Sequence, residues 1–323
     1  MAAPRAADTQ SPPVFTGREW RHSGHKEPAS LRVVTYNVLA QCYTRSSEFP
    51  WTTPSSALKW KNRSAALLRD LAALDADLLL LQEVDEFDSF WQAALASLGY
   101  TALWKRRTQS TAAKKDGVAI AWRAERLRVD ASEGIEHNDL AACLPQVAGA
   151  ESAAPLNERT RLTRDCVGLL ADVTCLSSGR RAVVGTTHLY WDPQMEDVKN
   201  AQTAHLTSRA ASFLQARGCP ADTHILLGGD FNSMPLSTAH QLLLNSQGQQ
   251  PGLPVLHSVF GDTQPVATNY TPSFTEEIDY LVCSQGIRVL AVLDMPAVSA
   301  LSAGLPDALH PSDHLPVVAD LCF

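Results

Sequence analysis

The chain has 323 residues with a net charge of −7, and 45% of its residues are hydrophobic. This composition is typical of a packed globular protein, large enough for two average domains or for one extensive sandwich. No segment approaches the roughly 20 consecutive apolar residues that a membrane-spanning helix needs. The acidic net charge disfavours a strong non-specific binder of duplex nucleic acid, unless basic residues are locally concentrated.

The cysteines and the N-terminal stretch indicate the cellular setting. The seven cysteines include no Cys-x-x-Cys pair, so they predict neither a disulfide framework nor a zinc site and suit a reducing compartment. Residues 1–30 lack the apolar core of a secretory signal, and we expect a poorly ordered tail there, followed by one domain over residues 31–323. An organelle address in the tail remains an alternative, and a cytoplasmic location is the default, with the nucleus second.

The first predicted elements are a strand, a helix and a strand. Residues 31–36 form an apolar, β-branched run that stops at Asn37, as expected for a buried strand. Residues 58–74 predict a helix with one apolar stripe of leucines. Residues 77–81 predict a short strand, buried on both faces, that leads to Glu83.

The pattern of strands and helices continues to the C-terminus. Further helices are predicted at residues 87–98 and 195–215, and surface loops at 141–155 and 245–254. Further strands are predicted at residues 117–122, 167–174, 182–187, 225–228, 278–283, 287–293 and 315–321. Many strands with few helices favour two packed sheets flanked by helices.

Polar side chains repeatedly follow the predicted strands. They are Asn37, Glu83, His188, Asp230, Asn232, Asp279, Asp313 and His314. One such residue alone is more simply a turn former, but loops at strand ends are also where catalytic groups gather. Together these side chains could build one oxygen-rich site, which favours Mg²⁺ or Mn²⁺ over zinc. A phosphoester is a natural substrate for such a site, because a metal ion neutralises the charge that develops on its oxygens.

Several common catalytic motifs are absent from the sequence. We find no Gly-x-Ser-x-Gly, no Gly-x-x-x-x-Gly-Lys and no Gly-x-Gly-x-x-Gly pattern. The usual serine-hydrolase, nucleotide-loop and dinucleotide-binding interpretations are therefore disfavoured.

Six short blocks carry a resemblance to a known superfamily. They are T-Y-N-V-L-A (35–40), L-Q-E-V-D (81–85), T-H-L-Y-W-D-P (187–193), G-D-F-N-S (229–233), I-D-Y (278–280) and S-D-H-L-P (312–316). In this order they resemble the endonuclease/exonuclease/phosphatase superfamily over about residues 31–323. The resemblance implies an α/β (α+β) fold, the DNase I-like four-layer sandwich of two mixed β-sheets flanked by helices.

Longer phrases resemble one branch of that superfamily. T-Y-N-V-L-A-Q, L-K-W-K-N-R, K-R-R-T followed by K-K-D-G, and H-L-Y-W-D-P are similar to the deadenylases. That branch includes carbon-catabolite-repressor-type deadenylases, nocturnin, the Angel proteins and the 2′,5′-phosphodiesterase. No leucine-rich repeat precedes the domain in this sequence, so docking to a deadenylase scaffold through such repeats is not expected.

The resemblance implies a metal centre around Glu83. Glu83 would be the principal ligand of Mg²⁺, for which Mn²⁺ could substitute, since a carboxylate at the end of an apolar strand is costly without a cation. Asn37 would hold the same metal region or a phosphate oxygen. Asp313 would support a metal or His188.

The resemblance also implies the catalytic roles. Asp230 would orient or deprotonate the attacking water, and Asn232, two residues on, would project the same way and contact the phosphate or a second metal. His188 would donate a hydrogen bond to a phosphoryl oxygen. His314 would act at the scissile group, with Asp279 fixing its tautomer and favouring its charged form.

Substrate binding is predicted at two places. Pro193 and Phe274 match positions that sandwich adenine in deadenylase relatives, although Phe274 alone could be a core residue. Lys105, Arg107 and Lys115 belong to a basic run that could meet upstream phosphates, and the alternative is a solvated loop.

The leading hypothesis is a monomeric, Mg²⁺-dependent 3′ exoribonuclease that acts on single-stranded RNA, with poly(A) tails first, and releases 5′-monophosphates. One alternative is hydrolysis of small nucleotides: the 2′-phosphate of NADP, 2′,5′-oligoadenylate or cyclic-phosphate ends. The other is a non-catalytic RNA-binding module. No membrane partner is expected.

Overall fold

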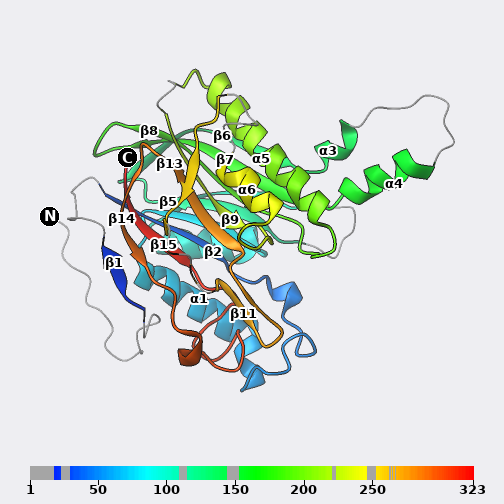
Figure 1. The fold of residues 1–323 in the computed structure, drawn as a ribbon. Helices are drawn as coiled ribbons and strands as arrows, with labels where there is room; N and C mark the ends of the chain where they lie inside the picture. The colour runs from blue at the N-terminus through cyan, green and yellow to red at the C-terminus, as the bar shows by residue number, and fades with distance from the viewer. Residues whose placement is uncertain are drawn as a thin grey trace.

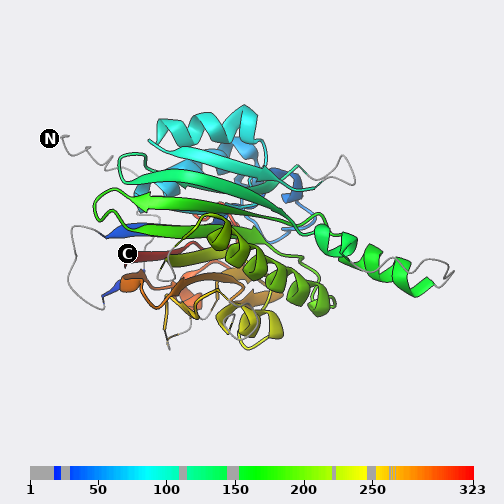
Figure 2. The same ribbon diagram turned by 90° about the horizontal axis from the view of Figure 1, so that it is seen from above.

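The computed structural model describes residues 18–22, 30–108, 115–143, 153–219, 223–245, 252–261, 263, 265 and 267–323. Within these residues, two large mixed sheets pack face to face and helices cover their outer faces (Figure 1, Figure 2). The predicted α/β sandwich is therefore confirmed.

One sheet has seven strands in the order β1-β14-β15-β2-β3-β5-β4. Its parallel pair is β2 with β3, and its other neighbours are antiparallel. The strand bounds are Trp20–His22 (β1), Leu31–Asn37 (β2), Leu78–Gln82 (β3), Thr101–Arg106 (β4), Gly117–Trp122 (β5), Arg288–Leu293 (β14) and Val317–Cys322 (β15).

The other sheet has six strands in the order β10-β13-β9-β8-β7-β6. Its parallel pair is β8 with β9. The strand bounds are Leu127–Glu136 (β6), Val167–Cys175 (β7), Arg181–His188 (β8), His224–Asp230 (β9), Leu256–Ser258 (β10) and Asp279–Ser284 (β13). A separate hairpin pairs Asn269–Thr271 (β11) with Phe274–Glu276 (β12).

Each sheet has its own helical cover. The six-stranded sheet carries α5 and α6, and the seven-stranded sheet carries α1 (Figure 1). Helix α2 packs in the same cluster as α1. The α-helices are Trp60–Leu74 (α1), Gln92–Ser97 (α2), Asp139–Ala142 (α3), Ala153–Leu162 (α4), Glu196–Ala216 (α5) and Thr238–Leu244 (α6). The short helical turns are Gln41–Tyr43 (η1), Ser55–Leu58 (η2), Phe87–Trp91 (η3) and Val298–Ala300 (η5).

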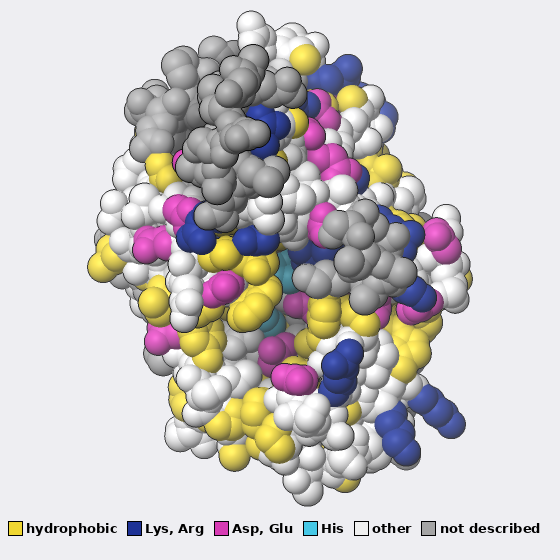
Figure 3. Space-filling view, turned by 90° about the vertical axis from the view of Figure 1, so that its right-hand side faces the viewer, with side chains coloured by type: hydrophobic (Ala, Val, Ile, Leu, Met, Phe, Trp, Pro, Cys, Tyr) yellow, Lys and Arg dark blue, Asp and Glu magenta, His cyan; other side chains and the backbone are white. Residues whose placement is uncertain are grey.

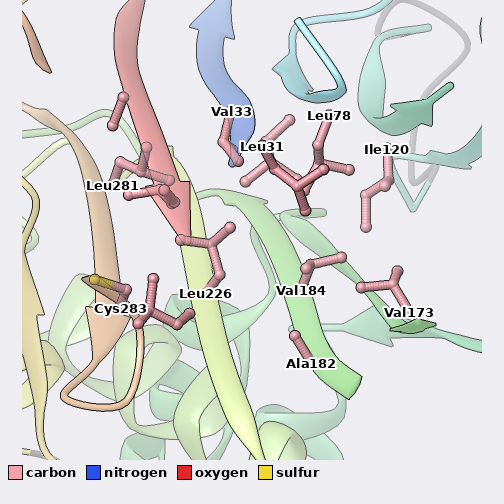
Figure 4. Packing of buried hydrophobic residues seen from close by; sticks show 14 of the residues in the cluster. Leu31, Val33, Leu78, Ile120, Val173, Ala182, Val184, Leu226, Leu281 and Cys283 are labelled. Atoms are coloured by element: carbon pink, nitrogen blue, oxygen red, sulfur yellow. The ribbon is translucent and has the colours of Figure 1, made fainter. Parts of the chain in front are cut away.

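The main core lies between the two sheets, and strand β3 shows how the sequence builds it. Side chains alternate across a strand, so Leu78 and Leu80 face the second sheet while Leu79 and Leu81 face α1. All four leucines are fully buried, as predicted for a strand covered on both faces. The inter-sheet layer joins Leu78 to residues such as Val184 and Leu226 (Figure 4).

Several expectations about single elements need correction. Edge strands β4 and β6 were not predicted, because their half-exposed, charged sequences lack the continuous apolar run of the central strands. The expected loop at 141–155 contains the end of α3 and the beginning of α4, with residues 144–152 outside the described part. Of the expected loop at 245–254, residues 246–251 also lie outside it.

Part of the predicted N-terminal tail joins the sheet. Residues 18–22 include β1, which pairs antiparallel with β14. The Arg18 guanidinium donates to the carbonyl oxygens of Asp294 (2.8 Å) and Pro316 (2.9 Å), and the Arg32 guanidinium lies 4.4 Å from the Trp20 ring centroid. These long-range contacts hold the segment, and no local sequence pattern encodes them. Residues 1–17 and 23–29 lie outside the described part.

A glycine sets the spacing of β8 and β9 at the end that carries the polar residues. A Cβ atom on Gly229 would lie 2.3 Å from the Thr187 carbonyl oxygen. Gly229→Ala should therefore force the strands apart and lower the free energy of unfolding by about 2 kcal/mol or more in a denaturant titration. Gly179→Ala is the control: nothing lies within 4 Å of its Cβ position, and its positive φ should cost about 1 kcal/mol. Equal losses would contradict the steric argument.

Candidate active site

The topology brings the polar strand ends to one edge of the sandwich. Parallel β2 and β3 both end there, placing Asn37 beside the residue that precedes Glu83. Parallel β8 and β9 end with His188 paired to Asp230. Antiparallel β13 begins at the same edge, where Asp279 pairs with Asp230. Figure 3 shows a hollow on this side of the molecule with histidine and acidic side chains at its floor.

Further contacts hold this edge together. His314 lies just before β15, which runs antiparallel to β2, and forms an isolated bridge with Asn269. The Gln82 side-chain amide donates to the Thr35 and Thr186 hydroxyls, 3.1 and 2.9 Å away, and so links the two sheets directly beneath the site. These contacts fix strand ends that lie far apart in the sequence.

Asn37 and Glu83 are joined by a buried hydrogen bond. The Asn37 Nδ2 donates to Glu83 Oε1 (3.0 Å) and to Asp230 Oδ2 (2.9 Å), and the Ala40 backbone N–H donates to Glu83 Oε2 (2.8 Å). Glu83 itself adopts a left-handed backbone with φ 57°. Because non-glycine residues rarely adopt that conformation, the surrounding structure must hold it in place, as is common at functional sites.

Glu83 is poorly accommodated as a charged group. Burial, together with the nearby carboxylates of Asp116 and Asp313, raises the pKa of its carboxyl to about 7 against the hydrogen bonds from Asn37 and Ala40, which lower it. A cation beside Glu83 would remove this penalty. The strand-end carboxylate therefore has the environment expected of a metal ligand.

Asp230 lies at the centre of the site. Its Oδ2 accepts from Asn37 and lies 3.5 Å from His188 Nε2 and 3.7 Å from His314 Nε2. Burial and the neighbouring Asp279 raise the pKa of Asp230 to about 7. A carboxyl with that pKa can exchange a proton near neutral pH, which suits a general base.

His314 and Asp279 form a tight pair. The His314 Nδ1 lies 2.8 Å from Asp279 Oδ2, and both side chains are buried. Burial opposes the charged imidazole, yet Asp279 and Asp313 raise the pKa of His314 well above its usual value. The geometry predicted for this pair is present: Nδ1 is tied to the carboxylate, and Nε2 is turned to Asp230.

Asn232 reaches the site differently from our expectation. Strand β9 ends at Asp230, so the alternation of a strand does not set the direction of Asn232, whose φ is 47°. Its backbone N–H donates to Asp230 Oδ1 (2.9 Å), its Nδ2 donates to the Leu189 carbonyl (3.0 Å), and Lys199 Nζ donates to its own carbonyl (2.8 Å). A turn braced by helix α5 therefore positions Asn232.

One group of side chains in the described residues has its ligand atoms arranged as for a metal ion: those of Asp230, Asp279 and His314 lie within 4.8 Å of one another. Asp313, whose charge acts on Glu83, has its Oδ1 buried without a hydrogen-bond partner. The Asp279 Oδ1 is also buried without a hydrogen-bond partner. Donor sets dominated by carboxylate oxygen favour a hard divalent cation.

The predicted substrate residues separate into exposed and buried ones. Pro193 and Phe274 are exposed, and Phe274 lies on β12 with 39% of its surface accessible, so it is not a core residue. Lys115 is exposed, while Lys105 forms an ion pair with Glu136. Arg107 is buried beside Asp116 and His188, away from the exposed surface on which we expected it to meet upstream phosphates.

Sequence reasoning missed one buried brace of the site. Arg63 on α1 donates to the carbonyl oxygens of Pro311 and Val38, both at 2.7 Å, and so ties the loop after β2 to the loop that carries Asp313. The L-K-W-K-N-R phrase contains this arginine, and only the fold shows that it turns inward.

Comparison with known proteins identifies the family. The model of the endonuclease/exonuclease/phosphatase family matches residues 34–314. The chain belongs to the endonuclease/exonuclease/phosphatase family. It is accordingly a hydrolase of this superfamily.

Curated relatives confirm the resemblance to the deadenylase branch. Carbon catabolite repressor protein 4 homolog 4 of Arabidopsis thaliana is 38% identical over 323 residues, covering 90% of this chain and 77% of that protein. The CCR4-Not complex 3′-5′-exoribonuclease subunit Ccr4 of Saccharomyces cerevisiae is 28% identical over 331 residues, covering 91% of this chain and 39% of that protein. The Ccr4 subunit of Yarrowia lipolytica is also 28% identical, and the chain spans 48% of it.

Solved structures share the fold. ANGEL2, described as a 2′,3′-cyclic phosphatase, superposes with a TM-score of 0.76 at 24% identity, covering 94% of this chain and 98% of that chain. The human Nocturnin catalytic domain superposes with a TM-score of 0.71 at 24% identity, covering 97% of this chain and 100% of that one. Among the helices of the described part of the chain, none combines the length and the hydrophobicity of a membrane-spanning helix.

Proposed function

We propose that the protein is a Mg²⁺-dependent 3′ exoribonuclease that trims single-stranded RNA, with poly(A) tails as the first candidate, and releases 5′-monophosphates. The observation that carries the proposal is the buried constellation of Glu83, Asn37, Asp230, Asp279 and His314. The names of the fungal relatives as 3′-5′-exoribonucleases support the same activity.

The residues divide the work of phosphodiester hydrolysis among them. Asp230 orients and deprotonates the attacking water, since its pKa of about 7 lies near the working pH. The charged His314, held by Asp279, donates from Nε2 to an oxygen of the scissile group. The Asn232 backbone N–H holds Asp230, and the second hydrogen of its Nδ2, which already donates to the Leu189 carbonyl, is proposed to contact the same phosphate.

We assign the metal site to Glu83, with Asn37 and Asp313 beside it. Mg²⁺ bound there would supply Lewis-acid stabilisation of the charge that grows on the phosphoryl oxygens. A second ion at Asp230, Asp279 and His314 is the alternative arrangement, in which His314 Nε2 would give up its proton and bind the ion instead of donating to the substrate. Whether one or two ions act is decided by measuring the stoichiometry of Mn²⁺ binding.

We propose that exposed rings close in sequence to site residues hold the terminal base. Trp191, 63% exposed, lies in the loop between His188 and Pro193, and Phe274 lies on the β11-β12 hairpin. Stacking on such rings holds single-stranded bases with little dependence on sequence. We therefore propose Pro193 and Phe274 as the base-binding pair.

Phe274→Ala should weaken binding of the terminal base. We expect kcat/KM for an A-tailed RNA to fall roughly tenfold or more, because stacking of one base is worth about 1–3 kcal/mol. Leu176→Ala is the control, since Leu176 is also an exposed large apolar residue but follows β7 at the opposite end of the sheet. Unchanged kcat/KM in Phe274→Ala would remove this residue from the substrate site.

The position of the basic residues favours small nucleotides as the second candidate. Arg107 is buried and Lys105 is paired with Glu136, so among the three predicted phosphate contacts Lys115 has its side chain on open surface. A small nucleotide needs no upstream phosphate contacts. Hydrolysis of the NADP 2′-phosphate, of 2′,5′-oligoadenylate or of cyclic-phosphate ends is therefore the main competitor.

A substrate panel separates these functions. Mg²⁺-dependent turnover is measured on a 5′-labelled A-tailed RNA, the same RNA with a mixed 3′ end, 2′,5′-oligoadenylate, a cyclic-phosphate end and NADP. Stepwise shortening that stalls outside the A-tract supports the poly(A) exoribonuclease. Turnover confined to a small nucleotide or a cyclic-phosphate end would favour the second candidate function, a phosphatase or phosphodiesterase of small nucleotides. No turnover on any of them would favour the non-catalytic RNA-binding module.

We also make proposals about the domain organisation, the oligomeric state and the location in the cell. We propose that one catalytic domain spans residues 31–323, to which residues 18–22 add strand β1, and that it acts as a monomer in the cytoplasm, with the nucleus as the alternative. The seven cysteines are all free, which suits a reducing compartment. Sedimentation of the purified chain tests the monomer.

A further inference from the structure

A buried chain of side chains leads from Asp116 through Arg107 to His188. Arg107 follows β4, Asp116 precedes β5, and His188 ends β8. The Arg107 Nε lies 3.1 Å from Asp116 Oδ2, and its Nη2 lies 3.2 Å from His188 Nδ1. Arg107 and His188 are only 8% and 7% exposed.

Further contacts hold the Arg107 guanidinium in one orientation. The Tyr43 hydroxyl donates to Asp116 Oδ1 (2.8 Å), the Arg107 backbone N–H donates to the Asp116 carbonyl (3.0 Å), and Arg107 Nη1 lies 3.4 Å from Cys166 Sγ. A guanidinium fork bound on several sides loses little freedom when it makes one more hydrogen bond. Arg107 is therefore a rigid support for the ring of His188.

The chemistry of arginine decides which nitrogen of His188 carries the proton. Burial opposes the charged guanidinium, but Asp116 raises the pKa of Arg107 well above its usual value. A guanidinium has donors and no acceptor, so the bond to His188 Nδ1 forms only if Nδ1 is unprotonated and accepts. The proton of the neutral ring then lies on Nε2, which faces Asp230 Oδ2 at 3.5 Å.

The two histidines of the site thus differ in the charge of the group that contacts Nδ1. His314 has a carboxylate behind Nδ1, which favours a proton on both ring nitrogens. His188 has a guanidinium behind Nδ1, so Nδ1 accepts a hydrogen bond and the ring proton lies on Nε2. His314 can therefore give up a proton, whereas His188 can donate a hydrogen bond from Nε2 and keep its proton.

We propose that Arg107 is a positioning residue that locks His188 as its Nε2–H tautomer, aimed at the phosphoryl oxygen beside Asp230. This inference rests on the proposed hydrolytic function for its catalytic meaning. Its structural content, the tautomer, stands independently of any substrate.

The first test needs no substrate. Long-range ¹H–¹⁵N NMR of the wild-type chain reports which nitrogen of each histidine is protonated, and His188→Asn assigns the signal. We expect an acceptor-type Nδ1 and a protonated Nε2 for His188 at neutral pH. A proton on Nδ1 would overturn the proposal even if the enzyme is active, whereas the expected tautomer in an inactive protein would overturn only the hydrolytic function.

The second test is a double-mutant cycle on catalysis. Arg107→Met should lower kcat roughly 10- to 100-fold with KM within about twofold, since the support of a site residue is lost rather than a substrate contact. In a His188→Ala background, the same change should lower kcat no further. Losses that multiply in the double variant would show that Arg107 acts independently of His188.

Two companion variants guard against misfolding and against a charge effect. Arg107→Met leaves Asp116 buried without its cation, so Arg107→Met combined with Asp116→Asn removes both charges and should show the same loss of kcat. Arg107→Lys keeps the charge but lacks the fork that reaches Asp116 and His188 together, and it should remain impaired. Wild-type kcat in Arg107→Lys would contradict the proposal.

Arg128→Met is the matched control. It breaks an exposed ion pair with Asp130 at the end of β6 that lies away from the site, and it should retain wild-type kcat.

Discussion

Glu83→Ala should reduce Mg²⁺-dependent hydrolysis by about 10³-fold or more while the fold is retained. Glu83 is the buried carboxylate that we assign to the metal, and its Oε1 also accepts the hydrogen bond that aligns Asn37 with Asp230. Removing it therefore removes electrostatic stabilisation of the transition state worth several kcal/mol. The measurement is kcat/KM over a Mg²⁺ titration, with circular dichroism to verify the fold.

Glu86→Gln is the matched control for this change. Glu86 lies three residues on, is exposed, and also has a positive φ of 47°. It should retain wild-type turnover. Glu83→Ala with wild-type kcat/KM and wild-type Mg²⁺ dependence would remove Glu83 from the metal site and favour the group of Asp230, Asp279 and His314.

The same carboxyl predicts a gain of stability that does not depend on activity. The folded-state pKa of Glu83 is raised to about 7, so the charged form disfavours folding. Its contribution to stability is full below its ordinary pKa of 4.5 and is lost as the pH rises through about 7. In the metal-free protein at pH 8, Glu83→Gln should therefore raise the free energy of unfolding, by roughly 3 kcal/mol at most. Mg²⁺ should raise the Tm of the wild type more than that of the variant.

Asp279→Asn should lower kcat by roughly 10²- to 10⁴-fold, the usual range for the loss of a positioned proton donor. The Asp279 carboxylate is the main group that raises the pKa of His314 against the effect of burial. With an amide in its place, His314 loses its proton at lower pH. The alkaline limb of the pH–kcat profile should therefore move to lower pH, because the active form needs the charged imidazole.

Asp75→Asn is the control for this substitution. Asp75 is an exposed aspartate paired with Arg123 beyond the end of α1, and asparagine tolerates its positive φ of 46°. It should leave both kcat and the pH profile unchanged. An Asp279→Asn enzyme with a reduced kcat but an unshifted alkaline limb would mean that Asp279 acts otherwise than by charging His314.

The sequence by itself was enough to predict the central strands and the polar residues that follow them. Strand β3 shows why: a run of four leucines is too short for a buried helix, so it favours a strand covered on both faces, and Glu83 follows at its end. The edge strands β4 and β6 were missed because a strand with one paired edge and a half-exposed face carries a weaker pattern.

Tertiary structure alone decided the direction of the side chains and their partners. From the sequence, Arg107 was predicted as one of several exposed cations in a basic run. In the structure, β4 pairs with β5, and Arg107 lies buried against Asp116 and His188. Asn232 obtains its direction from a turn braced by Lys199 rather than from strand alternation. Local pattern determines which residues are buried or follow a strand, because burial depends on periodicity along the chain. Contacts between residues far apart in sequence determine which of them share a proton or a metal, since only the packed sheets bring them within a hydrogen bond of one another.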